Sequence, residues 1–154
     1  MQFTNAARQL KKRNIPFTYH SYEVDESDVS AKHVAVSLGK PLDQLYKTIC
    51  LENEARRHAF FLISGDLDIN LKAAAKAWGV KKASPIPMKE LEALTGYVRG
   101  GVSPIGAKKR FPVFLHDRAR QKDTIIISAG KRGYQLELTP HDLISFTDGH
   151  WFTQ

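Results

Sequence analysis

Residues 45–64 read LYKTICLENEARRHAFFLIS, and this stretch decides which strands pair at the start of the fold. Apolar, aromatic and β-branched residues on either side of the polar Asn53-Glu54-Ala55 segment predict two strands, over residues 45–52 and 58–64. Because the connection between them is short, the two strands are expected to be antiparallel neighbours in a β-hairpin.

Helices and further strands flank this hairpin in an irregular order. Capping residues and apolar spacing predict helices over residues 4–14, 30–39, 71–78, 88–94 and a short segment from Thr139. Further strands are expected over residues 17–22, 111–115, 124–127 and 135–138. Asp66 and Asp68, or Asn70, are expected to cap the third helix. Because no steady βαβ rhythm appears, we predict one compact α+β domain over residues 1–154.

The charge balance favours an anionic partner. The chain has 154 residues, with 23 Lys and Arg against 16 Asp and Glu, which gives a net charge of +7. The basic residues form short clusters, and such a surface favours a polyanion such as nucleic acid, although it can also serve solubility alone. No apolar run is long enough to span a membrane, so we expect a cytoplasmic protein without membrane association.

The sequence offers little for metal or disulfide chemistry. Cys50 is the only cysteine, which excludes an intramolecular disulfide and a cysteine-rich zinc site. The six histidines lack the spacing of metal ligands, so no metal is expected. Nothing around Cys50 resembles a Cys–His–acid arrangement, and a buried structural thiol is the expected role.

Two glycine-rich segments follow in the second half of the chain. They are Gly100-Gly101-Val102-Ser103-Pro104-Ile105-Gly106 and Ser128-Ala129-Gly130-Lys131-Arg132-Gly133. A backbone without Cβ atoms can come close to a ligand or direct its N–H groups toward a developing oxyanion. One Gly-Gly pair alone would indicate only a tight turn, whereas two such loops together predict the walls of a small-molecule pocket.

Lys47 is the candidate for the floor of that pocket. In a strand, alternation places it on one face with Leu45 and Ile49, and places Tyr46 and Thr48 on the other. A lysine among apolar neighbours either extends its ammonium group to water or donates a hydrogen bond inside a pocket. The residues alone leave both interpretations open, and they name no substrate.

These segments resemble the YbaK/EbsC family, the free-standing relatives of the editing domain inserted in bacterial prolyl-tRNA synthetases. The resemblance covers nearly the whole chain and rests on Tyr46-Lys47-Thr48, on Asn70-Leu71-Lys72-Ala73-Ala74-Ala75-Lys76, and on residues 95–110 and 128–133. It implies a mixed, strongly curved sheet with surrounding helices. It also implies a trans-acting aminoacyl-tRNA deacylase without metal or organic cofactor, whose partners are the acceptor end of tRNA-Pro and prolyl-tRNA synthetase.

The resemblance also assigns roles to residues. Lys47 would be the catalytic pocket lysine that positions the aminoacyl end. The expected substrate-binding residues are Tyr22, Thr48, Gly100, Gly101, Ser103, Pro104, Ile105, Gly106, Ser128, Ala129, Gly130 and Gln135. The expected tRNA-contacting residues are Lys108, Lys109, Arg110, Lys131 and Arg132.

The chemistry that the resemblance implies needs no protein nucleophile. In the cysteine-clearing members the substrate thiol attacks its own ester carbonyl and releases a thiolactone, while alanine-clearing relatives use a positioned water. A non-catalytic module that binds an aminoacyl or nucleotide ligand and regulates a synthetase is the alternative from another class.

Two departures bear on the choice of amino acid. Gln135 stands where the cysteine-specific relatives have an aspartate, and a residue near Val29 or Ser30 replaces an aromatic one.

Overall fold

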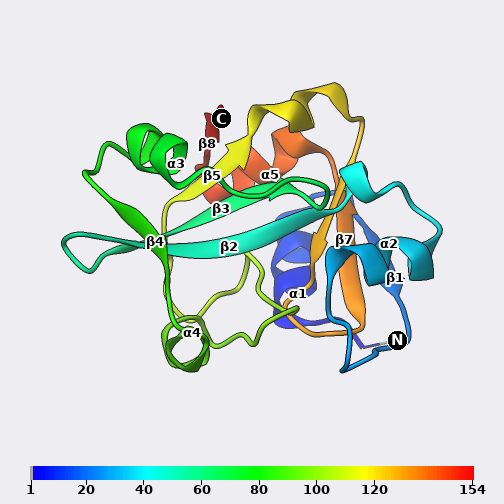
Figure 1. The fold of residues 1–154 in the computed structure, drawn as a ribbon. Coiled ribbons are helices and arrows are strands. Elements are labelled where there is room, and N and C mark those ends of the chain that lie inside the picture. The colour runs from blue at the N-terminus through cyan, green and yellow to red at the C-terminus, as the bar shows by residue number, and fades with distance from the viewer. Residues whose placement is uncertain (1) are drawn as a thin grey trace.

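The hairpin predicted at residues 45–64 is present and lies inside the larger of two sheets (Figure 1). The computed structural model describes residues 2–154. Strand β2 (Tyr46–Asn53) pairs antiparallel with β3 (His58–Ser64), from Tyr46 opposite Ser64 to Glu52 opposite His58. The Asn53 side chain closes the turn, because its Oδ1 accepts from the backbone N–H groups of Ala55 and Arg57.

The other elements follow the predicted order closely. The helices are α1 (Asn5–Lys12), α2 (Ala31–Leu38), α3 (Leu71–Trp78), α4 (Met88–Thr95) and α5 (Pro140–Thr147), with 3₁₀ turns η1 (Leu42–Gln44) and η2 (Asp117–Gln121). The remaining strands are β1 (Thr18–Ser21), β4 (Ala83–Pro85), β5 (Val113–His116), β6 (Ile125–Ser128), β7 (Tyr134–Leu138) and β8 (His150–Phe152).

The strands form two sheets that meet at one point. The larger sheet has the order β4-β2-β3-β5-β8 and is mixed, since β4, β2 and β3 are antiparallel while β3, β5 and β8 are parallel. The smaller sheet, β1-β7-β6, is antiparallel. A single parallel bridge between Leu45 and Ile126 connects them. The α+β fold class is confirmed, and the division into one domain stays a prediction.

Both faces of β3 are buried, which explains its almost continuous apolar sequence. Phe60 and Leu62 pack with α1, α5 and the smaller sheet, whereas Phe61 and Ile63 pack with α3. Figure 1 shows α3 and α1 on opposite sides of the β2–β3 pair. Four apolar side chains in sequence therefore anchor two separate clusters on opposite faces of the sheet.

One edge of β2 is partly unpaired, and this free edge leaves room for a cavity in the fold. Strand β4 pairs only with Leu51 to Asn53 of β2, and the bridge to the smaller sheet involves only Leu45. Between these two points, no strand within residues 2–154 pairs with β2 on the side opposite β3. The larger and smaller sheets separate there, and loops border the gap.

One of the predicted helix caps is wrong. Thr4, Ser30 and Asn70 accept hydrogen bonds from backbone N–H groups of their helices, so α1, α2 and α3 begin as expected. Asp66 does not cap a helix. Its carboxylate accepts from the hydroxyl of Ser64 at 2.6 Å and pairs with Arg118 at 3.0 Å. Within residues 2–154, no helix is long and apolar enough to cross a membrane.

Candidate functional site

A cavity of about 640 Å³ opens at the free edge of β2, and we call it the β2 pocket. Its lining comes from α2, β2, α4 and both glycine-rich segments. The lining residues are Val29, Ser30, Ala31, Lys32, Val34, Leu45, Tyr46, Lys47, Thr48, Ile49, Cys50, Gly65, Pro85, Ile86, Met88, Leu91, Arg99, Gly100, Val102, Ser128 and Gln135. The size is within the range of small-molecule sites.

Six consecutive residues of the β2 region, 45–50, line this pocket. Consecutive residues of a strand point to opposite faces, so a pocket on one face would be lined by alternate residues only. A pocket at an unpaired edge touches both faces and the backbone between them. The free edge therefore explains why Lys47 and Thr48, which point to opposite faces, both contribute.

The backbone polar groups at this edge can be assigned from the strand register. Phe60 donates its N–H to Pro112, on the side away from β2. Its partner Cys50 is therefore in a pair that exchanges no hydrogen bonds across β2 and β3, and its N–H and C=O point to the free edge. The alternation repeats at Thr48. The edge thus offers backbone donors and acceptors to a ligand.

Two hydroxyl groups in this wall lack partners. In the described part of the chain, the buried Tyr46 Oη and Thr48 Oγ1 have no hydrogen-bond partner, and both residues line the pocket. Burial raises the pKa of Tyr46 to about 12, so its hydroxyl is neutral and can donate. Unpaired buried polar groups are uncommon because they cost free energy. The charged groups around the Tyr46 hydroxyl, which include Arg118 and Asp66, do not line the pocket.

Lys47 lies half-buried on the pocket wall, opposite Ile63 of β3. No ion pair holds its ammonium group among residues 2–154. A lysine free of carboxylate partners in such a wall can donate to a carbonyl oxygen or attract an anionic group.

Cys50 also lines the pocket but is chemically quiet. Its side chain is 5% exposed, and burial raises the pKa of its thiol to about 12. Since the thiolate is the nucleophilic form, this thiol is inert near neutral pH. The sequence interpretation of Cys50 as a buried thiol agrees with this position.

The first glycine-rich segment contributes its beginning to the β2 pocket. Gly100 lies on the wall, with Arg99 and Val102 beside it. Ser103 and Ile105 are buried in the interior, at 0% and 1% exposure, and do not line it. The physical reason is that the Ser103 Oγ accepts from the Ile105 N–H in a tight turn. Three predicted residues of this segment, Pro104, Ile105 and Gly106, line a different cavity.

The second glycine-rich segment contributes Ser128, the last residue of β6, which lies opposite Gln135 of β7. Gln135 is 5% exposed and lies on the pocket wall. Ala129 and Gly130 lie behind this wall, since Ala129 is fully buried in the main core. The structure therefore gathers the predicted catalytic Lys47 and the predicted substrate-binding residues Thr48, Gly100, Ser128 and Gln135 around the β2 pocket.

The two segments pack directly on each other. A Cβ on Gly101 would lie 3.3 Å from the backbone nitrogen of Arg132, which is tighter than an ordinary contact. The Arg132 side chain donates from Nε to the carbonyl of Arg99 at 2.8 Å. Gly101 and Arg132 thus join the loops, and Gly101 faces this joint instead of the pocket.

Tyr97 completes the joint and was missed by the sequence reasoning. Its ring lies 2.9 Å from where a Cβ on Gly130 would stand, and its hydroxyl donates to the Ile105 carbonyl at 2.6 Å. The available signal was its place in Thr95-Gly96-Tyr97, directly before the first segment.

Tyr22 is close to the pocket without lining it. It packs against a cluster that contains Val34 and Leu45, which do line the pocket. Its backbone N–H donates to the carbonyl of Gly133 at 2.9 Å. Val29 and Ser30, the positions of the second departure, both lie on the wall.

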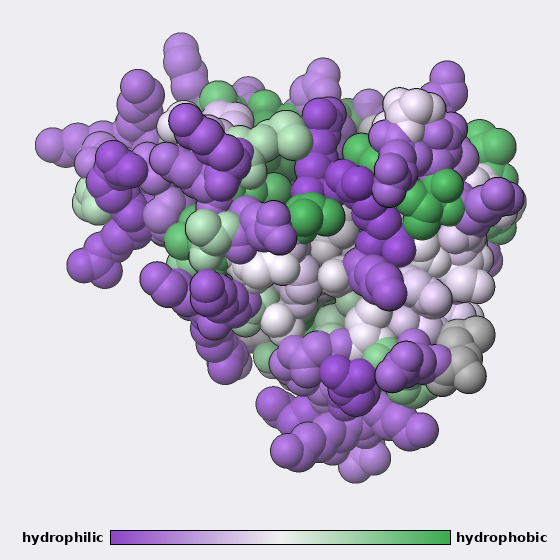
Figure 2. Space-filling model, turned by 90° about the horizontal axis from the view of Figure 1, so that it is seen from below, coloured by the Kyte–Doolittle hydropathy of each residue, from purple (hydrophilic) through white to green (hydrophobic). Residues whose placement is uncertain are grey.

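The predicted tRNA-contacting residues are spread over the surface. Lys108, Lys109, Arg110 and Lys131 are exposed, whereas Arg132 is half-buried in the loop joint. Figure 2 shows the face seen from below, hollowed near its centre, with apolar and weakly polar residues inside a mostly hydrophilic rim. Within residues 2–154 no three His, Cys, Asp or Glu side chains are grouped closely enough to hold a metal ion.

Most of the chain matches a known protein family. Residues 25–146 match the sequence profile of the aminoacyl-tRNA editing domain. A protein of Enterococcus faecalis named as a candidate Cys-tRNA(Pro)/Cys-tRNA(Cys) deacylase, EbsC, is 41% identical over 150 residues, which cover 97% of this chain and 92% of that protein. The uncharacterized protein YwhH of Bacillus subtilis is 27% identical over 125 residues, 81% of this chain and 79% of that one.

A solved structure shares the fold. The crystal structure of a candidate trans-editing enzyme for prolyl-tRNA synthetase superposes with a TM-score of 0.80 at 22% identity, over 99% of both chains.

Proposed function

Because this chain belongs to the family of aminoacyl-tRNA editing domains, we propose that it is a trans-acting deacylase that removes cysteine from mischarged tRNA-Pro. The observation that carries the proposal is the meeting of Lys47, Gly100 and Ser128 around one cavity of suitable size. All three lie inside the segment that matches the family profile. The choice of cysteine is supported by the name of the relative that is 41% identical.

In the proposed reaction the substrate supplies its own nucleophile. The sulfur of the cysteinyl group forms a bond to the ester carbonyl carbon, the bond from that carbon to the ribose oxygen breaks, and the thiol proton ends on the ribose oxygen. The products are a thiolactone and the uncharged tRNA. The raised pKa of Cys50 is consistent with this scheme, because the nearest protein thiol is not a competing nucleophile.

The pocket contributes orientation. Lys47 donates to the ester carbonyl oxygen, on which negative charge develops. The missing Cβ of Gly100 makes room for Val29, whose Cβ lies 2.9 Å from where it would stand, and so lets this wall close. Holding a thiol and a carbonyl in attack geometry can lower the barrier by about 7–11 kcal/mol. The basic surface attracts the tRNA, and prolyl-tRNA synthetase is proposed as the partner that presents it.

Gln135 favours one rival substrate. An uncharged amide in place of an aspartate can orient a water, so a deacylase for Ala-tRNA that uses such a water is the second candidate. The two candidates share the pocket and differ in the source of the nucleophile.

The test compares tRNA-Pro charged with cysteine, 2-aminobutyrate, alanine and proline. The side chain of 2-aminobutyrate has a methyl group where cysteine has its thiol, so it probes the thiol at nearly constant shape. Fast deacylation of the cysteinyl substrate alone is expected. Equal rates for cysteine and 2-aminobutyrate would contradict the thiol mechanism, and no turnover of any substrate would contradict the function and favour a non-catalytic binding module.

A further inference from the structure

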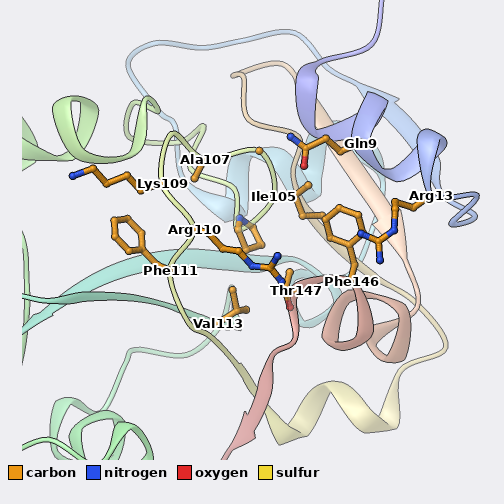
Figure 3. Close-up of a pocket in the computed structure, with 12 residues that line it drawn as sticks. Gln9, Arg13, Ile105, Ala107, Lys109, Arg110, Phe111, Val113, Phe146 and Thr147 are labelled. Carbon is orange, nitrogen blue, oxygen red and sulfur yellow. The ribbon is translucent and has the colours of Figure 1, made fainter.

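A second cavity, of about 200 Å³, lies on the other side of the first glycine-rich segment (Figure 3). We call it the α1–α5 pocket. Its lining residues are Gln9, Arg13, Pro104, Ile105, Gly106, Ala107, Lys109, Arg110, Phe111, Val113, Phe146 and Thr147. None of them lines the β2 pocket, so the buried Ser103 marks a partition between two separate cavities.

The lining is strongly basic. It includes three cations, Arg13, Lys109 and Arg110, and no carboxylate. Figure 3 shows Arg13, the residue that directly follows α1, and Arg110 extending toward Phe146 and Thr147 of α5, while Lys109 extends away from them. Two arginines from distant parts of the sequence therefore line the same small space, and both side chains stay exposed at its mouth.

Each guanidinium is held in a defined way. The Arg13 guanidinium lies over the ring of Phe146, 5.2 Å from its centroid. Arg110 pairs with the exposed carboxylate of Asp148 at 2.7 Å, at the C-terminal end of α5. The ring leaves the charge and the hydrogen-bond donors of Arg13 free, whereas Asp148 occupies part of the donor set of Arg110.

We propose that the α1–α5 pocket binds a phosphate group of the RNA substrate between Arg13 and Arg110, a contact that rests on the proposed function. The volume is below that of sites for whole small molecules, yet a compact phosphate needs little space. Paired guanidinium groups suit a phosphate because each can donate two parallel hydrogen bonds. The two cavities lie on either side of the same glycine-rich segment, so a phosphate bound here is held next to the loop that also forms a wall of the β2 pocket.

The site differs from a diffuse basic surface. Helix α1 also carries Lys12, which is exposed and does not line the pocket. A diffuse field would depend equally on Lys12 and Arg13, whereas the proposed site depends on Arg13 and not on Lys12. Lys12, the last residue of α1, is therefore the matched control, because it carries the same charge directly beside Arg13 in the chain.

The test is binding of an uncharged acceptor-stem RNA with a single-stranded 3′ end, measured against salt concentration. Arg13→Gln is expected to weaken binding and to reduce the slope of log K against log salt by about 1, the value for one lost phosphate contact. Lys12→Gln should leave the slope unchanged. Equal effects of both variants, or none for Arg13→Gln, would overturn the proposal.

A variant with the opposite sign guards against misfolding. Asp148→Asn frees Arg110 and keeps a residue that tolerates the left-handed conformation found there, φ 51°. It is expected to strengthen RNA binding, a result that a damaged protein would not give, and weaker binding would count against the site. Cytidine monophosphate is the second probe. If only its binding depends on Arg13, a free nucleotide is the ligand and the assignment to RNA is wrong.

These outcomes are separate from the proposed function. The RNA probe carries no aminoacyl group, so its binding does not depend on the chemistry in the β2 pocket. Normal deacylation with no role for Arg13 would refute only this site. Binding that depends on Arg13 without any deacylation would refute only the enzyme proposal.

Discussion

The hydroxyl of Tyr97 donates a hydrogen bond to the carbonyl oxygen of Ile105 at 2.6 Å, and its ring fills the space in front of Gly130. One side chain thus holds the first glycine-rich segment to the second. The wall of the β2 pocket depends on this joint, because Gly100 and Ser128 belong to the two segments that it connects.

Removal of the Tyr97 hydroxyl should cost stability. In Tyr97→Phe the Ile105 carbonyl loses its donor inside a buried region, and the expected loss is about 1–3 kcal/mol of unfolding free energy. Denaturant unfolding measures it. Tyr134→Phe is the control, since no hydrogen bond of its hydroxyl is present in the described residues, and its effect should stay within about 0.5 kcal/mol. Equal effects of the two variants would show that the joint is not as described.

The contact between Tyr97 and Gly130 gives a second prediction. Gly130 has φ 92° and no room for a Cβ, which would lie 2.9 Å from the Tyr97 ring. Gly130→Ala should therefore destabilise the fold by more than Gly39→Ala, where φ is also positive at 66° but nothing lies within 4 Å. The difference in unfolding free energy between the two variants isolates the steric cost. A difference near zero would mean that the two loops move apart at no cost in free energy.

Gln135→Asp tests the basis of amino-acid choice. Gln135 is buried on the pocket wall, and an aspartate there restores the residue that the resemblance associates with cysteine-specific relatives. We expect the ratio of kcat/KM for Cys-tRNA over Ala-tRNA to rise about tenfold, which corresponds to about 1.4 kcal/mol of discrimination. Gln135→Asn, which stays neutral, is the control. An unchanged ratio in the aspartate variant would remove Gln135 from the account of specificity.

Acid should weaken the fold through Glu137. Burial raises the pKa of this carboxyl, but hydrogen bonds from Thr124 and His20 outweigh it, and the net shift is below the ordinary value of 4.5. A lowered folded pKa contributes stability that is present above 4.5 and is lost as pH falls through the folded value. Unfolding free energy should decline below about pH 4.5, and Glu137→Gln should flatten that decline. If the unfolding free energy of the wild type and of Glu137→Gln falls with pH at the same slope, other groups cause the acid sensitivity.

Local sequence signals predicted most elements and missed two strands and both 3₁₀ turns. Thr4, Ser30 and Asn70 mark helix starts because a side-chain oxygen next to a helical run is a local signal. The missed strands, β4 and β8, are three residues long, which is too short for alternation to appear. Strand β4 also ends in Pro85, a residue that predicts a loop. Their pairing with β2 and β5 is decided by packing between distant segments.

The sequence predicted residues that line the pocket but not the reason why a cavity exists there. Both glycine-rich segments and Lys47 were identified from residue type, and Lys47, Gly100 and Ser128 do lie around one cavity. The cavity itself exists because β4 and the smaller sheet leave the edge of β2 unpaired, and no local pattern encodes an absent partner. Ser103 and Ile105 were expected in the wall because they share a segment with Gly100, whereas the turn at Ser103 directs them inward.

The most direct test of the account is single-turnover deacylation of Cys-tRNA-Pro by Lys47→Ala beside Lys76→Ala. Lys76 is exposed on α3 and does not line the β2 pocket, so it controls for loss of one positive charge. If Lys47 donates to the developing oxyanion, its removal should slow the reaction by about a hundredfold, while Lys76→Ala stays within about twofold of the wild type. A folded Lys47→Ala protein that reacts at the wild-type rate would contradict the assignment of the β2 pocket as the site of deacylation.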